Sequence, residues 1–274
     1  MKKAEYQKCL PLFARELRLS EKSQRTITKY ICDVQKFVNF IPDNEEITKE
    51  HVLAYKEKLC SGEYKSNSIN TYLVILNRFH RWAQVPGLSV KEIKTQQKSS
   101  ISDVVSSSDA KRLLRYAKKR KRDDIYLIMK IISTTGIRIS ELEYFTVENI
   151  QKHHFKAFNK GKEREIILTQ ELARELRKYC EDHKITEGKI FTLSIPTIWR
   201  QMKNTASEAK VALEKVHPHS FRHLFAKEFM EQYNNVLDLA DILGHSSLET
   251  TRIYTRSSLD EKRKKLENMS PRKK

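Results

Sequence analysis

The stretch "DDIYLIMKIISTTGIRISEL", residues 123–142, decides the fold of the second half of this chain. Its first part is apolar nearly all round, which predicts a helix that runs through the core of a domain. Gly136 is expected to end that helix, because glycine readily adopts the left-handed conformation of a helix terminus. Arg138 follows two residues later, so its guanidinium would lie at a helix junction, where Glu141 could orient it. Taken alone, this arginine and glutamate fit a structural ion pair as well as an active site.

The rest of the second half combines one hairpin with further helices. Residues 154–168, "HFKAFNKGKEREIIL", hold two β-prone segments on either side of Lys160-Gly161-Lys162, which predicts a β-hairpin with a cationic tip. Helical periodicity precedes this hairpin at 106–119 and follows it at 169–183, 195–210, 219–233 and 236–244. The expected fold is therefore mainly α with a small β-hairpin.

The first hundred residues predict a separate helical domain. Apolar stripes at helical spacing run through 21–40, 48–59 and 66–83. Pro86 and Gly87 interrupt this pattern, and the residues from 94 to 109 are rich in Ser and Gln, as in a linker. We expect an N-terminal helical domain over 1–97, a linker over 98–108, a second domain over 109–257 and a basic tail over 258–274.

The charge of the chain indicates a polyanionic partner. Its 274 residues include 53 Lys and Arg against 35 Asp and Glu, a formal net charge of +18. Nucleic acid is the first candidate partner and an anionic membrane the second, although no apolar run approaches the length of a membrane span. A merely solvated, lysine-rich surface is the alternative. On the first-domain helices the candidates for DNA contact are the basic side chains away from the apolar stripes, Arg25, Lys29, Arg78 and Arg81.

The cysteines indicate a reducing compartment. The chain has four of them, widely spaced and without a CxxC pair: Cys9, Cys32, Cys60 and Cys180. No charged-then-apolar signal segment is visible at the N-terminus. This pattern predicts buried free thiols in a cytoplasmic protein, associated with the nucleoid if DNA is the partner.

Histidine and arginine gather in "HPHSFRHLFA", residues 217–226. On a helix, His219 would share one face with Arg222 and His223, so that imidazole and guanidinium could converge on one oxyanion such as a phosphate. Zinc is the competing ligand, because two histidines four residues apart are a known ligand spacing. The glutamate of HExxH is missing, however, and an arginine is a poor neighbour for a divalent cation. A helix whose histidines have only a structural role is the remaining alternative.

A third motif is "LGHSSLETTRIYT", residues 243–255. Gly244 is expected to close one helix, and Ser246 with Glu249 would form a capping box for the next. Tyr254 would then lie about two turns into that helix, with His245 in the turn before it. The stretch 239–254 also fits a helix-turn-helix, which would make the protein a transcriptional regulator without catalysis. That alternative leaves the other motifs without a role.

These features occur in a fixed order: the arginine of "TGIRISEL", the cationic hairpin, "HSFRH", "LGH", and a tyrosine nine residues after that histidine. In this order and spacing they resemble the tyrosine recombinase (phage integrase) family, of the simple two-domain type. The resemblance covers the whole second domain, and the first domain resembles the family's core-binding domain. It implies a site-specific recombinase or integrase that cleaves and rejoins DNA through a 3′-phosphotyrosyl intermediate.

The resemblance also implies roles for individual residues. Tyr254 would be the nucleophile that attacks the scissile phosphate and frees a 5′-hydroxyl. Arg138 and Arg222 would grip the non-bridging oxygens and offset the charge of the transition state. His219 and His245 would add hydrogen bonds to the same oxygens or take the phenolic proton.

Further residues would support these. Lys160, on the hairpin, resembles the family's general acid, which protonates the departing 5′-oxygen. The family's hairpin often reads GKG followed by one more residue before the next lysine, whereas this chain is one residue tighter, so Lys162 stays an alternative. Glu141 would be the orienting carboxylate, and His223 a supporting residue.

The resemblance implies neither a metal nor ATP, because a phosphotyrosyl bond conserves the energy of the cleaved phosphodiester. The implied partner is double-stranded DNA, closed between the two domains, and recombination of two sites would use a homotetramer. Accessory DNA-bending proteins are further candidates. The chain begins almost at the core-binding domain, so we expect no additional arm-site reader before it. Mobile-element integrases, chromosome-dimer resolvases and inversion enzymes share this catalytic set, so the biological task stays open.

Overall fold

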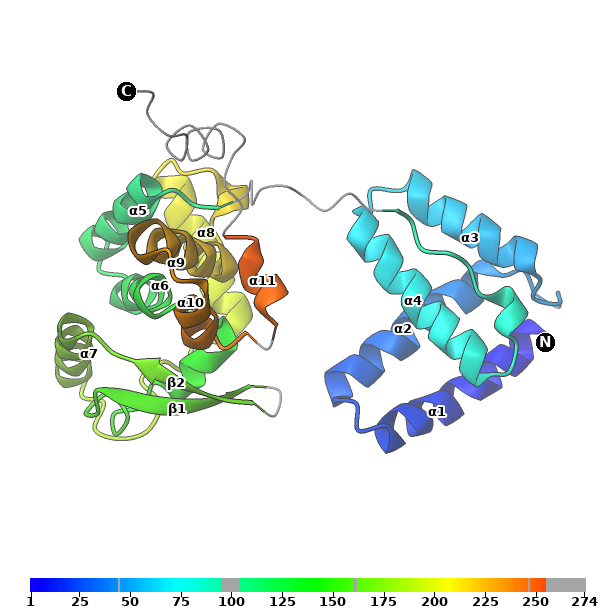
Figure 1. The fold of residues 1–274 in the computed structure, drawn as a ribbon, viewed down its shortest axis with the longest axis horizontal. Helices are drawn as coiled ribbons and strands as arrows, with labels where there is room; N and C mark the ends of the chain where they lie inside the picture. Colours follow the sequence, from blue (N-terminus) through cyan, green and yellow to red (C-terminus); the bar gives the residue numbers. More distant parts are fainter. Residues whose placement is uncertain (44, 95–103, 160–161, 246, 255–274) are drawn as a thin grey trace, which may run out of the picture. The chain divides into compact units, whose positions relative to one another are not determined.

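The structure is a computed structural model that describes residues 1–43, 45–94, 104–159, 162–245 and 247–254. The chain divides into two compact units, Met1–Gln97 and Lys98–Lys274 (Figure 1). Both units are built of helices, and the strands that the structure describes form one two-stranded antiparallel sheet in the second unit. The prediction of a mainly α protein with a small β-hairpin is confirmed.

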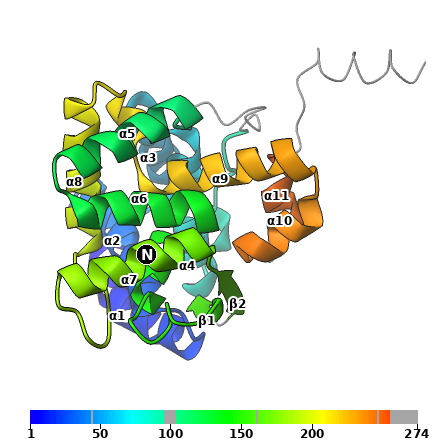
Figure 2. The ribbon, with the colours of Figure 1, turned by 90° about the vertical axis from the view of Figure 1, so that its left-hand side faces the viewer.

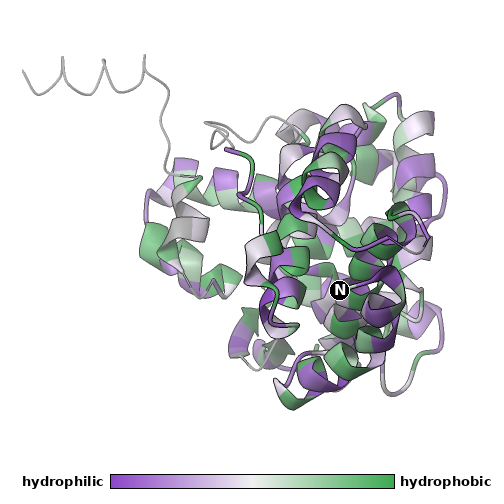
Figure 3. Ribbon diagram, turned by 90° about the vertical axis from the view of Figure 1, so that its right-hand side faces the viewer, coloured by the Kyte–Doolittle hydropathy of each residue, from purple (hydrophilic) through white to green (hydrophobic). Residues whose placement is uncertain are grey.

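Over the residues that the structure describes, the first unit holds four helices and a short 3-10 turn: α1 (Lys3–Leu19), α2 (Gln24–Phe40), α3 (Lys49–Ser61), α4 (Ser66–Trp82) and η1 (Pro86–Leu88). The side chains of Ser23 and Thr48 cap α2 and α3 by accepting backbone N–H groups. Hydrophobic and hydrophilic residues alternate along these helices (Figure 3), as the apolar stripes predicted.

Helix α1 was not among the predicted helices. Pro11 lies inside it and cannot donate a backbone hydrogen bond. Tyr6, Leu10, Phe13 and Leu17 nevertheless follow helical spacing and are all buried. Burial of four large side chains, each contributing roughly 1.5–3 kcal/mol, outweighs one lost hydrogen bond.

The core of the first unit is rich in aromatic rings. The ring of Phe79 lies 5.2 Å from that of Tyr6 and 5.1 Å from that of Phe13, measured between centroids. His80 is 0% exposed, beside the rings of Tyr6 and Phe37, and neither of its nitrogens makes a hydrogen bond of good geometry to the described residues. This core therefore contains an imidazole that must stay neutral.

The second unit is built around α6 (Asp123–Thr135), which contacts four other helices and lies between α5 and α7 in Figure 2. The side chains of Ile125, Ile128 and Ile132 are 0% exposed, as expected of a helix that is apolar all round. The elements around it are α5 (Ser107–Lys119), η2 (Ile139–Tyr144), β1 (His154–Asn159), β2 (Lys162–Ile167), α7 (Gln170–Asp182), α8 (Ile195–Glu208), η3 (Leu213–Lys215), α9 (Pro218–Tyr233), α10 (Val236–Leu243) and α11 (Leu248–Arg252).

The hairpin has one buried face. Strands β1 and β2 pair so that Phe155 lies opposite Ile166 and Ala157 opposite Arg164, and all four residues are buried. Residues of the other face, such as Phe158 and Ile167, are exposed. Strand alternation thus directs Arg164 into the interior.

The packed part of the second unit begins inside the range that we expected to be linker. Val105 is buried and its backbone N–H donates to Oγ of Ser220 over 2.7 Å. Helix α5 starts at Ser107, capped by Ser106. The segment from 104 to 108 therefore belongs to the second unit, because its apolar side chain and its cap are engaged there. Residues 95–103 and the predicted tail over 258–274 lie outside the described residues.

The prediction of buried cysteines is only partly right. All four are free thiols, but Cys32 and Cys60 are exposed, Cys9 is half-buried and Cys180 is buried. Cys32 and Cys60 lie on helix faces turned away from the apolar stripes, where no packing covers them. In the described part of the chain, no helix combines the length and the apolar character needed to cross a membrane.

His80 makes the first unit sensitive to acid. Burial, reinforced by the charge of Lys49, lowers its pKa from 6.5 to about 4. Below pH 6.5 the unfolded chain therefore binds a proton at His80, whereas the folded unit binds it only below about pH 4. As the pH falls through this range, the free energy of unfolding decreases by about 3 kcal/mol in all. The measurement is the denaturant concentration at the unfolding midpoint, reported by Trp82 fluorescence in a Trp199→Phe background. We expect this concentration to be lower at pH 4.5 than at pH 7.

The matched control is His80→Phe, because phenylalanine fits the aromatic surroundings and does not titrate. This variant should lose much less stability over the same pH range. Equal losses in the two proteins would contradict the role given to His80.

Candidate active site

Arg138 is fixed by the tight turn that ends α6. Gly136 has φ +61° and ψ 25°, in the left-handed region. A Cβ there would lie 2.5 Å from the ring of Phe225 and 2.8 Å from the side chain of Leu243, so only glycine lets α9 and α10 approach this closely. The chain then turns into η2, with Arg138 as the residue before its first turn.

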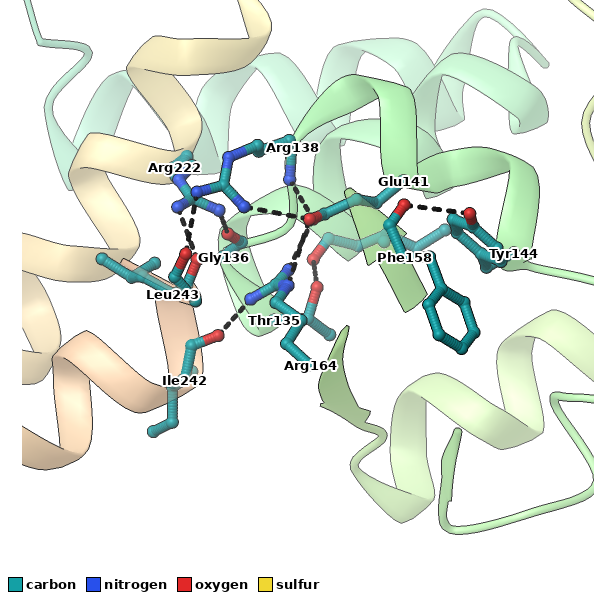
Figure 4. Close-up of polar contacts among 12 residues, drawn as sticks. Thr135, Gly136, Arg138, Glu141, Tyr144, Phe158, Arg164, Arg222, Ile242 and Leu243 are labelled. Atoms are coloured by element: carbon teal, nitrogen blue, oxygen red, sulfur yellow. Dashed lines mark hydrogen bonds and ion pairs between the residues drawn. The ribbon is translucent and has the colours of Figure 1, made fainter. Parts of the chain in front are cut away.

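Glu141 lies between two arginines (Figure 4). Its carboxylate accepts from the backbone N–H of Arg138 over 2.7 Å and from Nη1 of Arg138 over 3.0 Å. On its other side it accepts from Nε and Nη2 of Arg164, over 3.2 and 2.6 Å. Burial alone would raise the pKa of Glu141, but the charge of Arg164 and the hydrogen bonds from both arginines lower it below the ordinary value. The carboxylate is therefore ionised at neutral pH.

Three guanidiniums meet at the C-terminal end of α10. Arg164 donates to the carbonyl of Ile242, Arg222 donates to that of Leu243 over 2.8 Å, and Arg138 donates to that of Gly244 over 3.0 Å. The last carbonyls of a helix have no partner within the helix and carry the negative end of its dipole. Three consecutive carbonyls thus hold the arginine cluster, which we define as Arg138, Arg164 and Arg222.

The arginine cluster is cationic and poorly hydrated. Arg222 is 3% exposed and also donates to the carbonyl of Gly136. Burial, together with the charges of Arg138 and Arg164, lowers its pKa to about 9, which leaves it protonated at neutral pH. Among the described residues, Glu141 is the carboxylate paired with the cluster, so three positive charges face one negative charge. The net charge of +2 favours an anionic ligand.

His245 follows directly on the helix end. Its Nε2 lies 3.1 Å from Nη2 of Arg222, and its Nδ1 lies 2.8 Å from Oγ1 of Thr251. Because a guanidinium only donates, Nε2 must accept, which assigns the proton to Nδ1. Burial and the charge of Arg222 lower the pKa of His245 to about 4, so the imidazole is neutral.

A cleft of about 910 Å³ opens beside the arginine cluster. Burial and the charge of Arg222 lower the pKa of His219, which lies on its wall. The lining residues come from η2, β2, α9, α10 and the turn after α10, and they include Arg138, Glu141, Arg164, His219, Gly244 and His245. Of the residues that the sequence singled out, the cleft therefore joins Arg138, Glu141, His219 and His245.

Tyr254 is held at the side of this arrangement. Its hydroxyl is hydrogen-bonded to Nδ1 of His223, and its side chain packs against the small apolar cluster that α9 and α10 form. Burial raises the pKa of Tyr254 to about 12, although the charge of Arg222 acts in the opposite direction. Burial lowers the pKa of His223 to about 4. A neutral phenol is therefore hydrogen-bonded to a neutral imidazole.

The position of Tyr254 in the secondary structure was predicted wrongly. Helix α11 ends at Arg252, and Tyr254 lies in the turn after it, with its N–H donating to the carbonyl of Thr251 over 3.0 Å. The chain tightens into an i to i−3 turn here instead of continuing the helix. The capping box predicted from Ser246 and Glu249 lies outside what the structure describes.

The lysines of the hairpin cannot be placed in the same way. Lys160 and the side chain of Lys162 lie outside the described residues. In the first unit, Arg25, Lys29 and Arg81 are exposed, and Arg78 is half-buried. Lys29 forms an ion pair with Asp33 over 2.6 Å. Among the residues that the structure describes, no group of three His, Cys, Asp or Glu could hold a metal ion.

Arg164 is the residue that sequence reasoning missed. It stands between Glu163 and Glu165, so the strand looks charged and solvated. The available signal was the alternation of the strand, which places Arg164 on the same face as Ile166.

Comparisons with known proteins show the family of this chain and its fold. Residues 103–261 match the sequence profile of the phage integrase family, and residues 10–85 match that of the phage integrase N-terminal SAM-like domain. The tyrosine recombinase XerA of Saccharolobus solfataricus is 29% identical over 274 residues, covering 92% of this chain and 89% of that protein. A tyrosine recombinase of Pseudothermotoga lettingae is 29% identical over 254 residues, covering 85% and 87%.

Solved structures share the fold. A lambda integrase dimer bound to a core site aligns with a TM-score of 0.75 at 18% identity, covering 94% of this chain and 96% of that chain. A lambda integrase tetramer bound to a Holliday junction aligns with the same TM-score of 0.75 at 18% identity, covering 94% and 80%.

Replacing Glu141 by Gln tests whether the buried carboxylate stabilises the arginine cluster. The amide removes the negative charge between Arg138 and Arg164, so we expect the free energy of unfolding to fall by about 3 kcal/mol. The measurement is urea denaturation followed by Trp199 fluorescence in a Trp82→Phe background. Glu208→Gln, in the more exposed Arg122–Glu208 pair, is the control and should change stability little. A loss for Glu141→Gln no greater than that of the control would contradict the assignment.

Proposed function

This chain belongs to the phage integrase family of tyrosine recombinases, and from that premise we propose that Tyr254 is the nucleophile with which it cleaves and rejoins DNA. Its phenolic oxygen attacks the scissile phosphorus and forms a 3′-phosphotyrosyl bond, while the bond from phosphorus to the 5′-oxygen breaks. The departing 5′-oxygen takes up a proton. Rejoining is the same reaction in reverse, with the 5′-hydroxyl of a partner strand as attacking group.

The observation that carries this proposal is the cationic cleft beside the arginine cluster. Arg138 is 29% exposed on its side chain and lines the cleft, so it can turn donors toward a phosphate while Glu141 and Gly244 hold its other side. Arg222 lies deeper and contributes a permanent positive charge in a poorly hydrated environment, where charge stabilisation is strong. Together they offset the negative charge that builds on the pentavalent phosphorus.

The histidines supply further contacts to the phosphate. His219 lies on the wall of the cleft, within reach of a bound anion. In the DNA-free geometry, the Nε2 of His245 accepts from Arg222. A phosphate oxygen would compete for that Arg222 donor and release Nε2 for proton transfer.

The phenol needs activation before it can attack. With a pKa of about 12, its ionisation at pH 7 costs about 7 kcal/mol, at ~1.4 kcal/mol per pKa unit. Moving the hydroxyl from His223 toward the arginine cluster and the phosphate exchanges a neutral partner for positive charges. Proton loss and attack are therefore coupled to entry of the tyrosine into the cleft.

DNA is the partner that the charge and the family support. The net charge of +18 supplies counterion-releasing contacts, for which Arg25, Lys29, Arg78 and Arg81 are the candidates in the first unit. Relatives have been solved as a dimer on a core site and as a tetramer on a Holliday junction. We accordingly propose four copies of this chain on two DNA sites, with the two units closing on each duplex.

A purely DNA-binding helix-turn-helix is not favoured. Helix α11 has five residues, Leu248–Arg252, and Thr251 within it is buried. The turn before it is engaged by Arg138 and Arg222 through the carbonyls of Gly244 and Leu243. A recognition helix needs a free polar face that can enter the major groove, and a turn whose carbonyls are not already bonded to buried arginines.

Tyr254→Phe tests the nucleophile. A nicked suicide substrate traps the covalent intermediate, because the short 5′-hydroxyl fragment diffuses away and cannot be rejoined. The unaltered protein should form an adduct that survives denaturing electrophoresis, in buffer with EDTA and without ATP, and Tyr254→Phe should form none while it still binds the DNA. Tyr233→Phe, which removes the hydroxyl of an exposed tyrosine on α9, is the control. An adduct with Tyr254→Phe would refute the assignment.

The choice between Lys160 and Lys162 can be made with a leaving group that needs no proton. An alkoxide is strongly basic, whereas a thiolate leaves unassisted, since thiols have a pKa near ~8.5. We expect Lys160→Ala to cleave ordinary DNA on the order of 100-fold more slowly and to regain most of that rate on a substrate with sulfur at the 5′-bridging position. Lys162→Ala should lose little on either substrate. The reverse pattern would assign the general acid to Lys162.

A further inference from the structure

We propose that Arg164 is a positioning residue for DNA cleavage, which holds Glu141 and, through it, the guanidinium of Arg138 against the scissile phosphate. This inference rests on the proposed function of the cleft and adds to it a residue that does not itself touch DNA.

The strand register delivers Arg164 to the interior. Arg164 lies opposite Ala157 on the buried face of the hairpin, whereas its neighbours Glu163 and Glu165 lie on the exposed face. Its side chain is 7% exposed. A small residue opposite leaves room for the long arginine side chain, and a buried guanidinium must find partners for its donors.

Each nitrogen of Arg164 has such a partner. Nε and Nη2 donate to the two carboxylate oxygens of Glu141, over 3.2 and 2.6 Å, and Nη1 donates to the carbonyl of Ile242. This paired geometry is the strongest that arginine and a carboxylate can form. All the guanidinium nitrogens of Arg164 therefore bond to protein acceptors, whereas the side chain of Arg138, with 29% exposure, faces the cleft.

Glu141 transmits this constraint to Arg138. Each of its carboxylate oxygens is shared: one accepts from Nη1 of Arg138 and Nε of Arg164, the other from the backbone N–H of Arg138 and Nη2 of Arg164. Four bonds on two oxygens leave the carboxylate no freedom to rotate. Without Arg164, two of the four bonds vanish, and the carboxylate can follow Arg138 or pull it away from the cleft.

Arg164 also braces the second support of Arg138. A Cβ on Gly244 would lie 2.5 Å from Cδ of Arg164, and Gly244 has φ +61°. The aliphatic part of Arg164 thus packs directly on the turn whose carbonyl accepts from Nη2 of Arg138. Both groups that hold the Arg138 guanidinium, Glu141 and Gly244, rest on Arg164.

Arg164→Met and Arg164→Lys test this proposal. Methionine keeps apolar packing on Gly244 but makes no hydrogen bonds, so we expect strand cleavage on the order of 100-fold slower, as for a small misplacement of a reacting group. Lysine keeps the positive charge beside Glu141 but not the fork, and should lie between methionine and the unaltered protein. The dissociation constant for DNA should change less than twofold, because Arg164 makes no contact with it.

The matched control is Arg122→Met, which breaks a more exposed arginine–glutamate pair of the same unit, with Glu208 over 2.5 Å. It should lower the unfolding temperature only slightly and should not slow cleavage. If Arg122→Met cleaves as slowly as Arg164→Met, the role of Arg164 is only a general stabilising one, and the proposal is overturned. If Arg164→Met fails to fold, Arg164→Lys carries the same comparison, since it leaves Glu141 with a counter-charge.

A substrate with an uncharged scissile group separates positioning from folding. A methylphosphonate replaces one non-bridging oxygen by methyl, so there is less charge for Arg138 to stabilise. The ratio of rates between the unaltered protein and the Arg164 variants should shrink at least tenfold on this substrate and stay unchanged on the 5′-bridging sulfur substrate. If the rate ratio shrinks only on the sulfur substrate, Arg164 acts through the hairpin lysine. If the ratio shrinks on neither substrate, Arg164 acts neither through Arg138 nor through the lysine. Either result overturns the proposal.

Different results would refute the proposed function and the role of Arg164. If the unaltered protein forms no DNA adduct, the proposed function itself is wrong. If it forms the adduct and Arg164→Met cleaves equally fast, the proposed function stands and only the role of Arg164 is wrong.

Discussion

The structure depends on the C-terminal end of α10, where three consecutive carbonyls accept hydrogen bonds from three arginines. Three guanidiniums at close range repel one another, and burial adds a desolvation cost for each. The helix end offsets these costs with carbonyls that would otherwise lack partners and with the negative end of its dipole. Glu141 supplies the remaining charge. A cationic centre can therefore exist inside the second unit before any phosphate arrives.

The same constraint explains residues that have no chemistry of their own. Gly136 and Gly244, both at φ +61°, let α6 and α10 end within reach of the arginines, and a Cβ at either would collide with its neighbours. The hairpin brings in Arg164 from a distant part of the sequence. Backbone turns, strand register and helix ends thus determine where the charges lie, and function follows from that placement.

The proposed nucleophile, Tyr254, lies at the side of the arginine cluster and bonds to another partner. The hydroxyl of Tyr254 is hydrogen-bonded to His223, and the pKa of the phenol, about 12, keeps it protonated. His245 and His223 are neutral, with pKa values of about 4. Permanent charge therefore comes from the arginines, whereas the histidines and the tyrosine are held as neutral hydrogen-bonding groups. In the proposed mechanism, the DNA phosphate is the anion toward which the phenol moves when it leaves His223.

Local patterns predicted much of this from the sequence. The apolar run before Gly136 gave the central helix, and the turn at Lys160 gave the hairpin, because periodicity and glycine act over a few residues. Helix α1 was not predicted; it contains Pro11, and the burial that stabilises it is tertiary. Arg164 escaped because two flanking glutamates look like a solvated surface until the hairpin folds onto Glu141. The turn that carries Tyr254 depends on packing against α9, which no local pattern reports.

We propose that this cationic cleft directs Tyr254 onto a DNA phosphate. The most direct measurement is mass spectrometry of the covalent protein–DNA adduct after nuclease and trypsin digestion. Cleavage after Arg252 and Arg256 yields a peptide of residues 253–256, in which Tyr254 is the single tyrosine. The account predicts a 3′-linked nucleotide on this peptide. A nucleotide on any other peptide, or linkage through a 5′-phosphate, would contradict it.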